Sequence, residues 1–131
     1  MKKLYFIYNP HSGREQIRTK LSDILQIFSN AGYELTVYPT KEAKDAMRQI
    51  AKLPDDYDLV VCSGGDGTMD EVVQGMMRRL HRIPLGYIPS GTVNDFARSL
   101  KIPRDMVRAA GIAVNGRDFA CDMGTFELED L

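Results

Sequence analysis

The stretch LVVCSGGDGTMDEV, residues 59–72, places three glycines and one carboxylate between two apolar patterns of different period. Before the glycines, a continuous apolar run predicts a buried strand over 58–62. After them, apolar residues recur at spacings of three and four positions, which predicts a helix over 68–80. A buried strand that passes through a short glycine turn into a helix is the repeating unit of parallel α/β sheets.

The same alternation of strand and helix continues along the rest of the chain. Strands are predicted at 4–8, 34–38, 58–62, 85–88 and 118–122, and helices at 13–31, 41–52, 68–80, from near Thr92 to before Pro103, and about 103–114. Gly32 is placed to cap the C-terminus of the first helix. The pattern predicts one three-layer α/β/α domain over residues 1–131, with a mostly parallel sheet and helices on both faces.

Composition narrows the class of protein. The 131 residues, 44% hydrophobic and 27% charged, suit one globular domain, and a net charge of -1 argues against a nucleic-acid partner. Cys62 and Cys121 end apolar runs without metal-ligand spacing, which predicts two buried, reduced thiols. No apolar run is long enough for a signal peptide or a membrane span, so we expect a cytoplasmic protein, with peripheral contact at the inner membrane surface left open.

Three loops after predicted strands share one form. They are NPHSGRE (9–15), SGGDGTMDE (63–71) and PSGTVND (89–95). Each places a hydroxyl three residues before a carboxylate, in the pairs Ser12 and Glu15, Thr68 and Glu71, and Thr92 and Asp95. This spacing is typical of a capping box at a helix start, where free N–H groups and the helix dipole favour anions. Turn chemistry alone would explain the first loop, but three such loops at one sheet edge predict a polyphosphate site.

Asp66 is the residue that turn chemistry does not explain. A carboxylate would repel a bare phosphate, but Mg²⁺ is typically held by one or two carboxylates together with substrate phosphates. We therefore interpret Asp66 as a ligand of a metal ion that bridges to phosphate. The dinucleotide fingerprint fails because Asp70 stands where its last glycine is required, and no P-loop motif occurs in the chain.

GGDGT after a strand, preceded by NPHSG and followed by IPSGTVNDFARSL, closely resembles the catalytic domain of the diacylglycerol kinase family, particularly the bacterial diacylglycerol and lipid kinases. The resemblance covers essentially the whole chain. It implies a fold like the nucleotide-binding domains of phosphofructokinase and NAD kinase, with ATP and Mg²⁺ as cofactors.

The resemblance also implies roles for individual residues. The first ATP-contacting loop would be Asn9, Pro10, His11, Ser12 and Gly13, with Thr40 as a further nucleotide contact; Gly64, Gly65, Asp66, Gly67, Thr68, Met69 and Asp70 would cradle the phosphates. Asp66 would be the catalytic and metal-binding carboxylate, and Glu71 would support it. Thr92 would complete the site, flanked by Asn94 and Asp95. The family commonly has Leu and Asn at positions 69 and 70, so Asp70 adds a charge near the phosphates.

The implied activity is transfer of the γ-phosphoryl group of ATP to a lipid hydroxyl at the membrane surface, with diacylglycerol as the expected acceptor and phosphatidic acid as the product. Family enzymes hold the lipid and the acceptor's base in a second, β-rich domain, which we expect to be absent from this chain. The chain would then be a fragment or a natural truncation. The alternatives are a soluble sugar or NAD kinase with the same GGDG turn, and a noncatalytic nucleotide-binding module; a homodimer is left open.

Several other residues have ordinary structural interpretations. His11 lies in a loop that we assign to phosphate positioning, and His81 is expected to be a solvated cation near a helix end. The basic run RRLHR (78–82) is interpreted as a solvated helix end in preference to a lipid contact. Met69, Met76 and Met77 are predicted to be core residues in preference to a lipid groove.

Overall fold

The computed structural model describes residues 1–11, 16–90, 105–115 and 125–126. Its strands are β1 (Lys2–Tyr8), β2 (Tyr33–Pro39), β3 (Leu59–Gly64), β4 (Leu85–Pro89) and β5 (Thr125–Phe126). Its helices are α1 (Gln16–Asn30), α2 (Asp45–Ala51), α3 (Asp66–Met77) and α5 (Met106–Asn115). The helix expected from near Thr92 and the strand expected at 118–122 lie outside the described residues.

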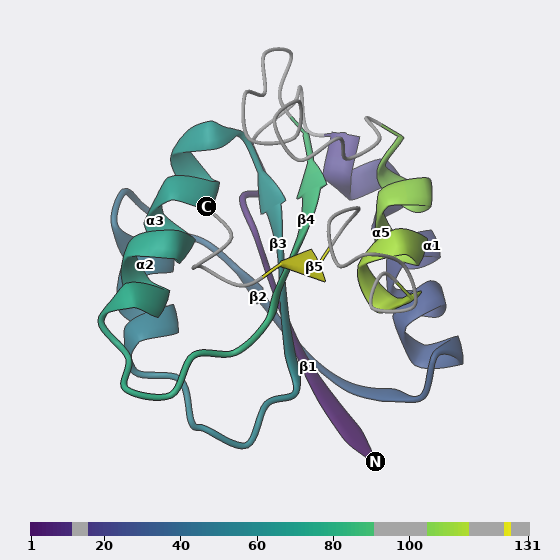
Figure 1. Cartoon of the computed structure of the whole chain (residues 1–131). Helices are drawn as coiled ribbons and strands as arrows, with labels where there is room; N and C mark the ends of the chain where they lie inside the picture. The colour runs from purple at the N-terminus through teal and green to yellow at the C-terminus, as the bar shows by residue number, and fades with distance from the viewer. Residues whose placement is uncertain (12–15, 91–104, 116–124, 127–131) are drawn as a thin grey trace.

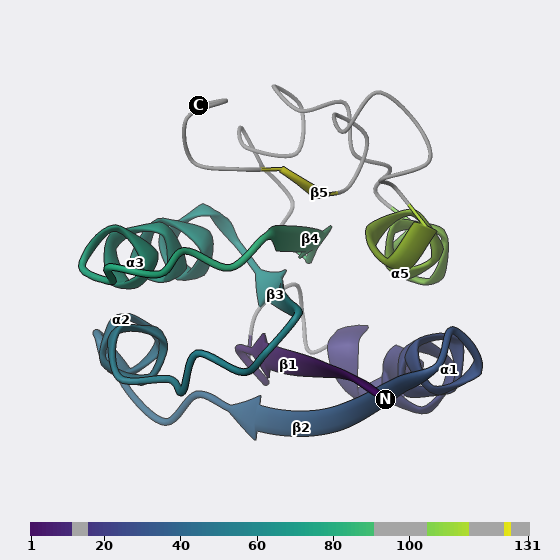
Figure 2. The ribbon, with the colours of Figure 1, turned by 60° about the horizontal axis from the view of Figure 1, so that its bottom comes forward.

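The strands form one sheet in the order β2-β1-β3-β4-β5. The first four strands in that order are parallel, and β5 pairs antiparallel with β4. Figure 1 shows the sheet between two helical layers, and Figure 2 shows α2 and α3 on one face with α1 and α5 on the other. The predicted three-layer α/β/α arrangement with a mostly parallel sheet is confirmed.

Burial follows the position of each strand in the sheet. Every residue of β3 and β4 is buried, as expected for central strands covered by helices on both faces. At the edge, β2 alternates between exposed and half-buried residues, because one of its sides has no neighbouring strand. The apolar run at 59–62 therefore lies at the centre of the sheet.

The strand order places a topological switch point between β1 and β3. The chain leaves β1 for β2 on one side and then crosses to β3 on the other side. Backbone hydrogen bonds join the carboxyl ends of the four parallel strands: Thr40 N–H to Tyr8 O at 2.8 Å, Asn9 N–H to Ser63 O at 3.0 Å, and Ser90 N–H to Gly64 O at 3.1 Å. Ligands of open α/β sheets bind outside this edge, at the switch point.

The second helix is shorter than predicted. We expected a helix over 41–52, but α2 begins at Asp45. Lys44 adopts the left-handed conformation, with φ 69° and ψ -1°, which a helix cannot continue through. The segment before it is therefore a loop at the carboxyl edge of the sheet. By contrast, the expected cap at Gly32 is confirmed, with φ 93° and an N–H that donates to Ser29 O at 3.0 Å.

The prediction of a capping box at Thr68 and Glu71 is wrong. α3 begins at Asp66, its N-cap is Gly65, and no side chain makes a capping hydrogen bond there. The intrahelical bonds start with the N–H of Met69 donating to Gly65 O at 3.1 Å, so Thr68 already lies in the first turn. The strand also runs two residues further than expected, to Gly64, which leaves a turn of a single residue between β3 and α3.

The C-terminal part of the third helix also differs from the prediction. α3 ends at Met77, which is exposed, whereas Met69 and Met76 are core residues as expected. In the basic run, Arg78, His81 and Arg82 are exposed, but Arg79 is buried. Its guanidinium donates to Ile50 O at 3.0 Å and to Leu53 O, and pairs with Asp55 at 2.5 Å. The interpretation of Arg79 as solvated is therefore wrong, because the end of α2 supplies carbonyl acceptors that the sequence does not reveal.

The two helices on one face pack at close range. A Cβ atom at Gly75 of α3 would lie 2.6 Å from the backbone oxygen of Met47 in α2, so glycine is needed there.

The cysteine in β3, Cys62, is buried, as predicted, and burial raises the pKa of its thiol. Cys121 lies outside the described residues. Within the described ranges, no helix combines the length and hydropathy that a membrane span requires.

Candidate functional site

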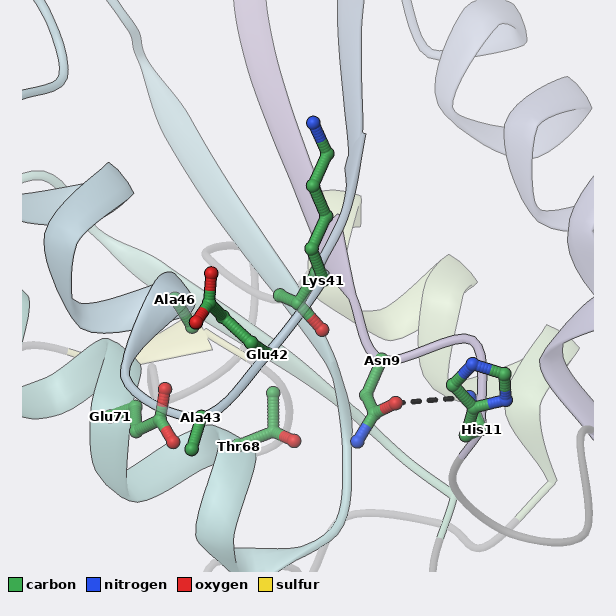
Figure 3. Close-up of a pocket in the computed structure, with 9 residues that line it drawn as sticks. Asn9, His11, Lys41, Glu42, Ala43, Ala46, Thr68 and Glu71 are labelled. Atoms are coloured by element: carbon green, nitrogen blue, oxygen red, sulfur yellow. Dashed lines mark hydrogen bonds between the residues drawn. The ribbon is translucent and has the colours of Figure 1, made fainter.

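A pocket of about 270 Å³ lies at the carboxyl edge of the sheet (Figure 3). Its lining comes from three segments that are far apart in sequence: Asn9 and His11 after β1; Thr40, Lys41, Glu42, Ala43 and Ala46 after β2; and Thr68 and Glu71 from α3. The volume is close to the lower end of the range for small-molecule pockets, roughly 300 Å³. The pocket lies at the switch point between β1 and β3, where the sheet topology favours a ligand.

The loop after β1 is ordered by its own asparagine. The Asn9 side-chain oxygen accepts a hydrogen bond from the backbone N–H of His11 at 2.9 Å, which closes a tight turn around Pro10. Asn9 and His11 reach the pocket, whereas Pro10 does not line it. Ser12 and Gly13 of the same predicted loop lie outside the described residues.

The segment after β2 forms a wall of the pocket, and we call residues 40–43 the β2–α2 wall. Thr40 was expected here, but Lys41, Glu42 and Ala43 were missed because the sequence predicted them to be helical. The signal that could have identified them is their position, since they directly follow a strand at the ligand-binding edge of a parallel sheet.

Within the described part of the chain, packing requires glycine at one of the three glycines near the start of α3 but not at the other two. At Gly64, a Cβ atom would lie 2.6 Å from the Thr68 Cβ, so the close packing of strand against helix needs glycine. At Gly65 and Gly67, no described atom lies within 4 Å of such a Cβ, and the extended backbone of Gly65, with φ -82° and ψ -173°, suits any residue. Neither packing among the described residues nor backbone conformation accounts for glycine at Gly65. A glycine here would let a ligand approach the backbone closely.

The predicted residues of α3 fall into three groups. Thr68 and Glu71 line the pocket, and Asp66 is partly buried in the first turn of the helix. The side chain of Met69 is wholly buried in the core, so only its backbone could face a ligand. Asp70 is exposed and accepts a hydrogen bond from the Gln74 amide at 2.8 Å.

The start of α3 suits a phosphate group. The first N–H groups of a helix have no intrahelical acceptor, and the helix dipole makes this end electropositive. Gly65 has no side chain with which to cap them, and a twelve-residue helix follows it. An anion that approaches over Gly65 and Gly67 would therefore meet backbone N–H donors.

The donor set also fits a Mg²⁺ ion bound together with phosphate. Across the described ranges, no three His, Cys, Asp or Glu side chains converge as a ready-made metal cage. Mg²⁺ that travels with a nucleotide does not need such a cage, because phosphate oxygens and water supply most of its ligands. The carboxylate of Asp66, the first residue of α3, where phosphate would bind, is of the ligand type that the ion takes from a protein.

A residue that the sequence did not reveal supports residues 64–67, which we call the glycine turn. The phenol of Tyr87, in β4, is wholly buried and donates to the carbonyl oxygen of Gly64 at 2.9 Å. Nothing in the sequence pattern distinguishes this tyrosine from an ordinary core aromatic. Thr92, Asn94 and Asp95, which the resemblance assigned to the same site, lie outside the described residues.

Comparison with known proteins shows similarity to proteins named diacylglycerol kinase. The sequence matches the model of the diacylglycerol kinase catalytic domain over residues 3–126. It is 41% identical over 124 residues to a diacylglycerol kinase of Staphylococcus aureus (strain bovine RF122 / ET3-1), which covers 94% of this chain and 39% of that protein. A diacylglycerol kinase of Staphylococcus saprophyticus is 40% identical, over 94% of this chain and 41% of its own length.

Solved structures agree. The crystal structure of a diacylglycerol kinase from Bacillus anthracis str. Sterne superposes with a TM-score of 0.80 at 33% identity, which covers 88% of this chain and 40% of that one. The chain spans about two fifths of the length of the relatives that it matches.

Proposed function

Because the chain belongs to the diacylglycerol kinase catalytic domain family, we propose that it binds ATP with Mg²⁺ at the carboxyl edge of its sheet and presents the γ-phosphoryl group to a lipid hydroxyl. The acceptor that we propose is diacylglycerol, and the product is phosphatidic acid. The relatives are named for this lipid, and a lipid acceptor implies peripheral contact with the inner membrane surface.

The observation that carries the proposal is the open glycine turn beside the pocket. Among the described residues, no atom lies within 4 Å of a Cβ at Gly65 or Gly67, and no side chain caps α3. The pocket between α3 and the β2–α2 wall adjoins the same turn through Thr68. A nucleotide can therefore place its phosphates on the backbone N–H groups and the rest of its length in the pocket.

The chain's own contribution to catalysis would be positioning and charge neutralisation. Phosphoryl transfer asks for little covalent chemistry from a protein, and most of the rate comes from alignment and electrostatic stabilisation. The N–H groups at the start of α3 would bind phosphate oxygens, and Asp66 would hold Mg²⁺, which when bound offsets the phosphate charge. Glu71, which lines the pocket nearby, would support this arrangement.

We propose that residues 1–131 are the nucleotide-binding part of such an enzyme. They account for about two fifths of the relatives that they match, and the glycine turn, the pocket and Asp66 all serve the phosphoryl donor. In this family the lipid pocket and the base that deprotonates the acceptor would belong to the remaining part.

Calorimetric titration of the chain with ATP in the presence and absence of Mg²⁺ tests the nucleotide site. We expect Mg²⁺-dependent binding, and Asp66→Asn should weaken it by about 10- to 100-fold, the range expected for a charged ligand contact. Asp56→Asn is the matched control, because Asp56 is exposed and pairs with Lys3 in a cluster distinct from the pocket lining. Mg²⁺-dependent affinity that survives Asp66→Asn would remove Asp66 from the metal site.

Phosphoryl transfer from labelled ATP to diacylglycerol micelles, NAD and a hexose, measured with the complete enzyme, tests the acceptor. Label in phosphatidic acid alone supports the lipid kinase. Label in NAD or the hexose alone would assign the chain to a soluble kinase with the same glycine turn.

A further inference from the structure

We propose that Asp45 is a positioning residue: it holds the β2–α2 wall in the shape that receives the nucleoside part of ATP. The inference rests on the proposed function, because it assigns a role within the same nucleotide site. Asp45 itself does not line the pocket.

Asp45 is a buried carboxylate with several donors. Its side chain, 5% exposed, accepts hydrogen bonds from the backbone N–H of Lys41 at 2.8 Å, from the Tyr38 phenol at 2.9 and 3.1 Å, and from the Gln49 amide at 3.3 Å. The Lys41 bond ties the first turn of α2 back to the middle of the wall. The Tyr38 bond ties the same helix turn to the C-terminal end of β2. A single carboxylate therefore links the strand, the wall and the helix.

The wall would not be expected to keep its conformation without such support. Lys44 lies between the wall and the helix with φ 69°, a left-handed conformation that is unfavourable for a non-glycine residue. Strain of this kind persists only where surrounding contacts determine the conformation, and it gathers at binding sites. The contacts here include those of Asp45, the ion pair between Arg48 and Glu42 at 3.9 Å, and two backbone bonds, Thr40 N–H to Tyr8 O at 2.8 Å and Asp45 N–H to Glu42 O at 3.2 Å.

The position of the wall indicates which part of the nucleotide it meets. The phosphates belong at the glycine turn, next to Thr68 on the α3 side of the pocket. The β2–α2 wall is a separate segment that lines the same pocket as Thr68. With the phosphates on α3, the wall meets the nucleoside.

A wall that is held in place before binding raises affinity, because the ligand does not have to order it. Releasing the wall should therefore weaken ATP binding but leave the binding of inorganic tripolyphosphate, which lacks the nucleoside, almost unchanged. This selectivity separates positioning from a general loss of structure.

The experiment is calorimetric titration of the chain with Mg-ATP and with Mg-tripolyphosphate. Asp45→Ala should weaken ATP binding by about 10-fold, as expected for loss of an ordering hydrogen bond to a charged group, and Asp45→Asn by less. Tripolyphosphate affinity should stay within about 2-fold for both variants, since the phosphate contacts remain. Asp55→Asn is the matched control, because Asp55 pairs with Arg79 outside the pocket, and it should change neither affinity.

Equal losses for ATP and tripolyphosphate, unchanged ATP affinity in Asp45→Ala, or an equal loss in Asp55→Asn would each overturn the inference. If Asp45→Ala does not fold, Tyr38→Phe tests the inference instead, because this change removes one donor and keeps the carboxylate. Tyr38→Phe should lower the affinity for ATP but not for tripolyphosphate. Failure of the wild-type chain to bind either ligand would instead reject the proposed nucleotide site, which is a distinguishable result.

Discussion

The phenol of Tyr87 donates a hydrogen bond of 2.9 Å to the carbonyl oxygen of Gly64, at the point where β3 passes into the glycine turn. The same oxygen accepts the N–H of Ser90 at 3.1 Å. One carbonyl at the carboxyl edge of the sheet is therefore held by two donors from β4 and the residue after it. The bond ties β4 to the start of the turn that precedes α3.

Tyr87→Phe removes the side-chain donor and leaves Gly64 O with its bond from Ser90. Because the acceptor is not orphaned, we expect a loss of about 1 kcal/mol in the free energy of unfolding, the usual net value of one hydrogen bond. Urea unfolding followed by circular dichroism measures it. The control is Tyr57→Phe, whose phenol meets Thr36 at an exposed site and should matter less. Equal effects of the two changes would show that burial adds nothing to the Tyr87 bond.

Gly67→Ala and Gly64→Ala should separate stability from binding. Gly67 lies in the first turn of α3, and no described atom lies within 4 Å of a Cβ there, so alanine should stabilise the fold by up to about 1 kcal/mol, the difference in helix propensity. The added methyl group would intrude where we propose that phosphate approaches, and ATP affinity should fall. Thermal unfolding and calorimetric titration of the same sample measure the two effects.

Gly64→Ala should behave in the opposite way in the unfolding experiment. Its methyl group would lie 2.6 Å from the Thr68 Cβ, and overpacking of this kind typically costs about 1–3 kcal/mol. If both alanine variants destabilise the fold equally, then the space above Gly67 is not open in solution.

Arg79 and Asp55 form an ion pair with unequal partners. Asp55→Asn should lower the free energy of unfolding by less than about 1 kcal/mol, because the Asp55 side chain is 75% exposed and water already screens the ion pair. Arg79→Met should cost about 2–3 kcal/mol, because it leaves the buried oxygens of Ile50 and Leu53 without this donor. Chemical unfolding of both variants measures the difference. Equal losses would mean that the salt bridge, rather than the carbonyl contacts, determines the contribution of Arg79.

The carboxylate of Asp45 should make stability depend on pH. Burial by itself would raise its pKa, but the hydrogen bonds from Lys41, Tyr38 and Gln49 outweigh burial and lower the pKa below the ordinary value. A lowered pKa stabilises the fold above the unfolded-state value of about 3.9, and this contribution is lost as pH falls through the lower folded-state pKa. The difference in unfolding free energy between wild type and Asp45→Asn should therefore shrink from pH 7 to pH 3. A difference that grows on acidification would contradict the assigned direction.

Much of the architecture could be predicted from local patterns. Continuous apolar runs identified the strands, and apolar spacings of three and four identified the described helices, because both patterns follow from the geometry of neighbouring residues. The glycine run with Asp66 identified the turn and its edge of the sheet. The predicted ends of the elements were less accurate. The left-handed conformation of Lys44 delays the start of the helix predicted over 41–52 to Asp45, and α3 starts after Gly65, which offers no capping side chain.

Local patterns in the chain were enough to predict the alternation of strands and helices, a candidate site at the carboxyl edge of the sheet, and the family resemblance carried by GGDGT and its two companion loops. The burial of Arg79, the bond from Tyr87 to Gly64 and the bond from Lys41 to Asp45 emerged only from the three-dimensional arrangement. The reason is physical. Periodicity is a property of residues a few positions apart, whereas burial and hydrogen-bond partnership depend on which distant segments the fold brings together.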